Sequence, residues 1–196
     1  MQRYIAPAGI GESEITEKRS RFIGRVVPVD SESAAKEEIA KTKAKHRDAR
    51  HNCWCYVIRG GPERCSDDGE PQGSAGQPML EIFKRGEISN VCCIVTRYFG
   101  GVLLGTGGLS RAYSEAAKLA LADAGKVEYH LRDSMEIICP YNLLGRIKSE
   151  IETHGGTIDR IEYAEHATLH VTTPEGESAT LKKRITDASA GIVTGC

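Results

Sequence analysis

The segment RYFGGVLLGTGGLSR, residues 97–111, decides the predicted fold, because it connects a strand to a helix. Val91–Thr96 before it is a compact apolar run, which is typical of a buried central strand. Leu109–Ala124 after it repeats apolar residues at helical spacing and stops at Gly125. The sequence therefore predicts a strand, a glycine-rich loop at Gly100–Gly108 and a helix in succession.

This glycine-rich loop has the features of an anion-binding site. Free backbone N–H groups at the start of a helix attract negative charge, and Arg97, Arg111 and the Thr106 hydroxyl would add to them. The loop is not a P-loop, because Thr106 and Gly107 stand where the lysine and the hydroxyl residue belong. It is not a dinucleotide fingerprint either, because Ser110 occupies the last glycine position. The alternative is a tight connection without a ligand; we favour binding, because the glycines outnumber what a turn needs.

A second glycine-rich segment, Ser66–Pro78, carries three carboxylates, Asp67, Asp68 and Glu70. Paired carboxylates can hold Mg²⁺ or act as acid and base, although the spacing excludes a calcium EF-hand. The alternative is a solvated turn in which Ser74 caps the following helix. Long glycine-rich loops in compact domains are commonly functional, so we interpret this segment as a recognition loop rather than a catalytic one.

A third candidate lies in Lys45–Cys55, which combines positive charge with histidine. If a strand begins at His51, the period of two places His51, Cys53 and Cys55 on one face. These residues could form part of a zinc site, but the spacing is not that of a zinc knuckle, and buried small residues are the favoured interpretation. A cysteine nucleophile paired with His46 or His51 is a further alternative. We predict no metal site and no cofactor.

The remaining pattern predicts two domains, 1–132 and 133–196, with a boundary near Arg132. The first domain has a strand within 13–29 that stops near Pro28, a helix at 33–45 capped by Asp30 or Ser31, a strand at 52–59 and a short helix at 79–84. For the second domain the sequence predicts a strand at 135–139, a helix at 141–153, a hairpin of strands 157–163 and 167–173, a helix at 178–188 and a strand at 191–194. This order, β-α-β-β-α-β, is that of a ferredoxin-like domain.

The composition of the chain limits the classes of protein to which it can belong. The 196 residues are 40% hydrophobic and 27% charged, as in globular proteins, and no apolar run is long enough to predict a membrane span or a secretory signal. Seven cysteines, an odd number, argue against a disulfide framework and favour reduced thiols in the cytoplasm. Residues 1–60 hold 12 lysines and arginines against 8 aspartates and glutamates, whereas 133–196 hold 6 against 10. The first domain thus has a modest basic face.

Four segments together resemble the IMPACT/YigZ family: Ser20–Ile23, Asp48–Trp54, Ser66–Pro71 with Gly73–Pro78, and Arg97–Leu109. The resemblance runs from Ile15 to about Arg132, and residues 133–196 resemble the second domain of bacterial members. Cys55 stands where alanine is common in the family and Gln77 where lysine is common, which weakens a zinc site and removes a cation from the anion site.

The resemblance implies an α+β fold. The first domain should resemble the second domain of ribosomal protein S5, and the second should be ferredoxin-like, as in elongation factor G. Eukaryotic members regulate translation by competing for the ribosome-bound activator of the amino-acid-starvation kinase, but they lack this second domain. For bacterial members the resemblance implies association with nucleic acid or the ribosome.

Three functions follow as hypotheses. The first is a non-catalytic protein that binds the ribosome or structured RNA and is linked to the regulation of translation. The second is an enzyme or binder acting on a small phosphorylated or anionic ligand at Gly100–Gly108, and the third an adaptor for a protein partner. The residues expected to bind anion or nucleic acid are Arg21, Arg50, His51, Arg97, Tyr98, Gly100, Gly101, Gly105, Thr106, Gly107, Gly108 and Arg111. Those expected in the recognition loop are Ser66, Asp67, Asp68, Gly69, Glu70, Pro71, Gly73, Ser74 and Gly76.

Overall fold

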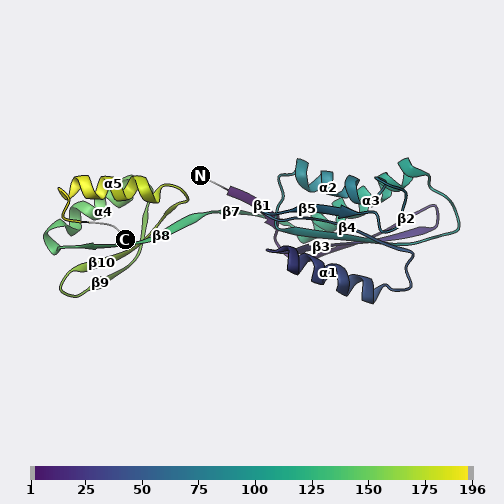
Figure 1. The fold of residues 1–196 in the computed structure, drawn as a ribbon, viewed down its shortest axis with the longest axis horizontal. Coiled ribbons are helices and arrows are strands. Elements are labelled where there is room, and N and C mark those ends of the chain that lie inside the picture. The colour runs from purple at the N-terminus through teal and green to yellow at the C-terminus, as the bar shows by residue number, and fades with distance from the viewer. Residues whose placement is uncertain (1–2, 194–196) are drawn as a thin grey trace. The chain divides into compact units, whose positions relative to one another are not determined.

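The computed structural model describes residues 3–193, which divide into two compact units: one is Tyr4–Tyr129, and the other consists of the chain from His130 onward together with Arg3. Both units mix helices with antiparallel strands, which confirms the α+β class (Figure 1). In the part of the chain that is described, no helix has the length and apolar character needed to cross a membrane.

The first unit is built on a five-stranded antiparallel sheet in the order β2-β3-β6-β4-β5. Its strands are β2 Gly11–Glu17, β3 Ser20–Pro28, β4 His51–Val57, β5 Glu63–Ser66 and β6 Val91–Tyr98. A separate two-stranded sheet pairs β1 Arg3–Pro7 with β7 Lys126–His130.

Helices cover both faces of the larger sheet (Figure 1). One face packs against α2 Gly76–Arg85 and α3 Thr106–Ala124, and the other against α1 Glu32–Lys45. The central strand β6 is buried over Val91–Arg97, as its apolar run predicts. Because side chains alternate along a strand, Cys93 and Val95 belong to the α2–α3 core, whereas Cys92 and Ile94 belong to the α1 core.

The predicted strand within 13–29 is wrong in one respect, because it is a hairpin of two strands. Lys18 and Arg19 both have positive φ angles, 44° and 66°, which reverse the chain between β2 and β3. The helix at 33–45 is confirmed as α1, and Ser31 is its N-cap, its hydroxyl accepting a hydrogen bond from the Ala34 N–H at 3.3 Å. The strands β1, β5 and β7 were not predicted.

The second unit has a three-stranded antiparallel sheet in the order β8-β10-β9. Its elements are β8 Arg132–Cys139, a 3₁₀ turn at Tyr141–Leu143, α4 Leu144–Thr153, β9 Thr157–Tyr163, β10 Ala167–Pro174 and α5 Ser178–Ala188. One side of the sheet packs on α4 and α5 through Ile137, Leu169, Ile147 and Leu181. Of the strand expected at 191–194, residues 191–193 are not a strand, and Thr194 lies outside the described residues.

Candidate functional site

Several connections of the first unit meet at one end of the five-stranded sheet. The register places Arg21 opposite Tyr98 and His51 opposite Arg97, so β3 and β4 begin where β6 ends. The hairpin turn 18–19, the connections 46–50, 67–75 and 99–105, and the start of α3 therefore lie together. We call this region the loop end.

The two glycine-rich segments meet at the loop end through a buried ion pair. Arg97 Nη1 lies 2.7 Å from Glu70 Oε1, and the two side chains are only 6% and 3% exposed. The Tyr113 hydroxyl donates to the same oxygen at 2.9 Å, and Arg97 Nη2 donates to the Ser20 hydroxyl at 3.3 Å. The charge expected to attract an anion is thus already paired, because period two turns Arg97 inward with Val95.

A cavity of about 450 Å³ opens above this ion pair, and both glycine-rich segments line it. We call it the Phe99 pocket; its wall consists of Arg50, His51, Gly69, Glu70, Pro71, Arg97, Phe99, Leu103, Leu104, Gly105, Thr106 and Leu109. His51 donates from Nδ1 to the Asp68 carbonyl at 2.8 Å, because a carbonyl can only accept. Its Nε2 consequently faces Glu70, at 3.9 Å.

Three long side chains of the expected anion set, Arg21, Tyr98 and Arg111, lie away from the Phe99 pocket. Arg21 and Tyr98 are on the α1 face of the sheet, where the Arg21 guanidinium lies over the Tyr98 ring at 5.2 Å. Tyr98 is also bonded to Asp48 and His46, and Arg21 pairs with Glu14 at 3.2 Å.

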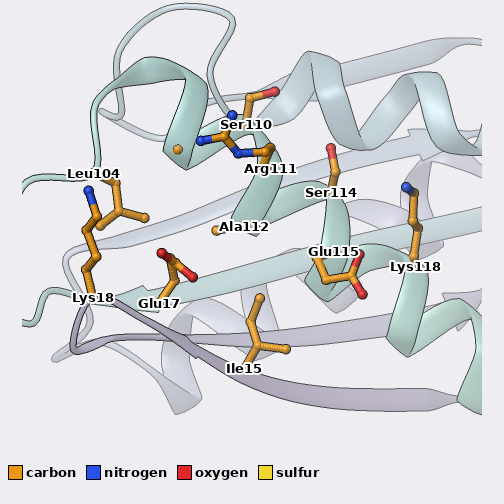
Figure 2. A pocket seen from close by; sticks show the side chains of 11 residues that line it. Ile15, Glu17, Lys18, Leu104, Ser110, Arg111, Ala112, Ser114, Glu115 and Lys118 are labelled. Carbon is orange, nitrogen blue, oxygen red and sulfur yellow. The ribbon is translucent and has the colours of Figure 1, made fainter.

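Arg111 points into a second hollow, of about 640 Å³, between α3 and β2 (Figure 2). This α3–β2 groove carries both signs of charge, with Lys18 and Lys118 beside Glu17 and Glu115. Leu104 belongs to the walls of both hollows.

The glycines of residues 100–108 have different roles. At Gly100 a Cβ atom would lie 2.0 Å from the Arg19 backbone, so the close approach of the β2–β3 turn excludes any side chain. Gly101 and Gly105 have positive φ angles of 84° and 73°. Gly107 and Gly108 lie in the first turn of α3, and a Cβ on Gly107 would meet nothing within 4 Å.

Two carboxylates of the recognition loop, Asp67 and Asp68, stabilise the conformation of the loop by accepting hydrogen bonds from backbone N–H groups. Asp67 accepts hydrogen bonds from the backbone N–H groups of Gly73, Ala75 and Gly76 at 2.8–3.0 Å, and so caps α2. Ser74 does not cap the helix; its hydroxyl donates to the Pro71 carbonyl at 2.6 Å. The role of Asp67 could not be predicted from the sequence, since a cap eight residues away from Ala75 requires a folded loop.

Asp68 ties the loop to its surroundings. Burial alone would raise the pKa of its carboxyl, but the 2.6 Å contact with Lys43 Nζ and the Asn52 N–H bond outweigh burial and lower it. Ser66 accepts from the Asp68 N–H, and Gly69 and Gly73 adopt positive φ angles. A Cβ on Gly76 would lie 2.9 Å from the Ser66 backbone, so these turns pack tightly.

The cysteines of β4 are core residues. Cys53 and Cys55 are fully buried on the α2–α3 face, as period two predicts, and burial raises the pKa of the Cys53 thiol to about 12. Within residues 3–193, no three His, Cys, Asp or Glu side chains are grouped so that they could hold a metal ion. The six cysteines described there are free thiols.

The apolar wall of the pocket and Tyr113 are not among the residues predicted from the sequence. Tyr113 follows Leu109 by four residues, so helical spacing places both on the buried side of α3. Phe99, Leu103 and Leu104 carry no periodic signal, because they lie in an irregular connection.

Comparison with known proteins bears on the same residues. Residues 18–121, which include the whole loop end, match the model of the Impact N-terminal domain. The chain belongs to the IMPACT family. Residues 137–191 match a second family model, a domain of unknown function named DUF1949.

Bacterial members of the IMPACT family resemble the chain along nearly its whole length. The family member YvyE of Bacillus subtilis is 37% identical over 193 residues, which covers 97% of this chain and 89% of that protein. YigZ of Escherichia coli is 33% identical over 196 residues, 97% of this chain and 96% of that protein. A crystal structure of a hypothetical protein, 31% identical, superposes with a TM-score of 0.67 and covers 100% of this chain and 97% of its own.

Proposed function

We propose that this member of the IMPACT family is a non-catalytic protein that binds the ribosome or structured RNA and contributes to the regulation of translation. The observation that carries the proposal is the gathering of exposed cations at the loop end, one of which, Arg50, lines the Phe99 pocket. Sequence resemblance adds support, since it implies a role in translation for eukaryotic members.

The cations of the basic face fall into two groups. Arg21, Arg25, Lys41 and Lys43 contact carboxylates, so their charge is largely balanced. Among the described residues no such ion pair involves the second group, which consists of Lys18, Arg19, Lys45, Arg47 and Arg50. All five of these belong to the hairpin turn, the end of α1 and the connection that follows it, which meet at the loop end.

This arrangement suits a phosphate backbone. The chain has a formal net charge of −1, so a general attraction to nucleic acid is weak, and binding depends on where the cations lie. Cations held at one end of the sheet by different connections can contact successive phosphates, each contact releasing counterions. We therefore expect RNA binding that is modest in strength and strongly dependent on salt.

The candidate catalytic side chains at and beside the loop end support binding over catalysis. A thiol with a pKa near 12 stays protonated at neutral pH, so Cys53 is not an activated nucleophile. Asp67 and Asp68 are engaged by backbone N–H groups and Lys43, and Glu70 by Arg97 and Tyr113. One observation favours a small phosphorylated ligand as a second candidate, since about 450 Å³ lies within the usual range of small-molecule sites, roughly 300–1,000 Å³.

The first prediction tests the loop end with a pair of double variants. Arg47→Ala with Arg50→Ala removes two of its cations, whereas Arg85→Ala with Lys126→Ala removes two exposed cations from the end of α2 and the start of β7. We expect the first pair to weaken binding to a fluorescent RNA stem–loop and to ribosomes about tenfold. The plot of log affinity against log salt concentration should become less steep, its slope decreasing in magnitude by about one to two.

The control pair should leave both quantities near the wild-type values. Fluorescence anisotropy across a salt series and co-sedimentation with purified ribosomes measure them. If the wild-type protein binds neither RNA nor ribosomes at moderate salt, or if the control pair weakens binding as much as the loop-end pair, the proposal is wrong.

A further inference from the structure

We infer that the Phe99 pocket takes one unpaired nucleotide of single-stranded RNA, with the base against Phe99 and the neighbouring phosphate between Arg50 and the first amides of α3. The inference rests on the proposed function and names the class of RNA that the loop end selects.

The apolar wall of the pocket offers a stacking surface. Phe99 is 40% exposed and Leu103 is 83% exposed, although both are large apolar side chains in a polar, glycine-rich connection. Guanidinium groups flank the ring, Arg97 at 5.4 Å and Arg50 at 5.8 Å from its centre. An exposed aromatic ring beside cations is the usual platform for a base in single-stranded nucleic acid.

The polar wall supplies donors for a phosphate. No side chain caps α3, and within the described residues the N–H groups of Thr106, Gly107 and Gly108 have no acceptor. Of these three residues Thr106 belongs to the wall of the Phe99 pocket, and Gly108 belongs to the wall of the α3–β2 groove. A helix of 19 residues also places the positive end of its dipole there.

A second observation at the same wall points to a ligand. Arg97 lines the pocket, is more than nine-tenths buried, and leaves its Nε without a hydrogen-bond partner. A buried donor without an acceptor is costly in a folded protein, and a bound water, ion or ligand is one way to satisfy it.

The geometry favours a single strand over a duplex. In a duplex each base is stacked on both sides and its ring faces are closed to a side chain. Phe99 can therefore stack only on a base that has left the helix, in a loop, a bulge or a single strand. The same chemistry could also be met by a free nucleotide, so the experiment must separate the two sources.

The second prediction uses Phe99→Ala with Tyr129→Ala as its matched control, because both rings are exposed, 40% and 45%, and Tyr129 lies on β7. Anisotropy with a fluorescent ten-nucleotide uridine RNA and with a duplex of equal length, both at low salt, gives the affinities, and uridine monophosphate serves as competitor. We expect Phe99→Ala to weaken single-strand binding about tenfold, within the range of roughly 1–3 kcal/mol for stacking one base. Duplex binding should change less than twofold.

A second variant guards against a folding defect. Leu103→Asp changes the most exposed apolar side chain of the pocket, so the fold should tolerate it, and its charge should also weaken single-strand binding. The inference is overturned if Phe99→Ala and Leu103→Asp bind single strands as the wild type does, or if they lose duplex binding equally. It is also overturned if uridine monophosphate binds in a Phe99-dependent way while the RNA does not. If the wild type binds ribosomes but no free RNA, the inference is overturned, and if it binds neither, the proposed function itself is contradicted.

Discussion

Glu70 is the residue on which the loop end depends most. Among the described residues it is the one carboxylate that forms an ion pair with Arg97, and it also accepts the hydrogen bond of Tyr113. Both ion-pair side chains are almost fully buried, so water can compensate the charge of Arg97 only poorly if Glu70 is lost. The pair links segments that are 27 residues apart and holds the floor of the Phe99 pocket.

The third prediction follows from this burial. Glu70→Gln should lower the free energy of unfolding by about 3–5 kcal/mol, because it leaves a buried guanidinium uncompensated. Glu63→Gln is the matched control, since it breaks the exposed pair with Lys84, 2.8 Å long, and should have a much smaller effect. Urea unfolding followed by circular dichroism measures both variants, and equal effects would show that the buried pair has no special role.

For single residues, the sequence predicts the face of a strand on which a side chain lies better than it predicts the side chain that it contacts. The period of two in Val91–Thr96 extends to Arg97 and turns it toward the core, which the sequence alone could have shown. That Glu70 meets it there could not be predicted, because the contact depends on the path of the recognition loop. The same holds for Asp67, whose capping of α2 joins residues six to nine positions apart.

At the scale of elements, the first turn of α3 contains a glycine without a structural reason. The φ angle of Gly107 is not in the left-handed region, and its missing side chain leaves open space. Alanine would stabilise a helix here by about 0.5–1 kcal/mol. The glycine therefore fits a close approach of a ligand to the helix start.

The fourth prediction tests this with two glycines in the same helical position. Gly107 is the second residue of α3, Gly145 is the second residue of α4, and both have open space at Cβ. Gly107→Ala and Gly145→Ala should each raise the free energy of unfolding by about 0.5 kcal/mol. Only Gly107→Ala should weaken RNA binding, by about threefold or more, as anisotropy would measure; a variant that is more stable and binds normally would contradict a ligand at the helix start.

The elements missed by the sequence analysis share a physical cause. The β2–β3 turn uses Lys18 and Arg19 in the left-handed conformation, where glycine or asparagine would have signalled a hairpin. β5, Glu63–Ser66, has four residues and no apolar alternation, since it is an edge strand held by backbone bonds to β4. The helices were predicted well because their apolar spacing arises within each helix.

At the scale of the whole molecule, the two units have separate cores. The apolar residues buried in the first unit form clusters around Phe22, Phe83 and Ile94, and those of the second gather around Ile137 and Ile147. This separation is consistent with the predicted domains 1–132 and 133–196, and the boundary near Arg132 stays a prediction.

The fifth prediction addresses that independence. Ile147→Ala should destabilise the second unit by about 2–5 kcal/mol, because it opens a cavity in its core. Hydrogen exchange should then speed up for amides of β8 and β10 and stay unchanged for β3 and β6. Phe83→Ala should produce the reverse pattern, and loss of protection in both units from either change would show a single cooperative fold.

Leu104 gives the loop end one more property, because this side chain forms part of the Phe99 pocket and of the α3–β2 groove in Figure 2. A ligand that fixes or displaces Leu104 from one side alters the hollow on the other side. Thermodynamic reciprocity requires the two effects on affinity to be equal. Binding of one molecule in the Phe99 pocket would thus change the affinity of the α3–β2 groove for a second molecule. The position of the Leu104 side chain would determine whether the two binding events are cooperative or competitive.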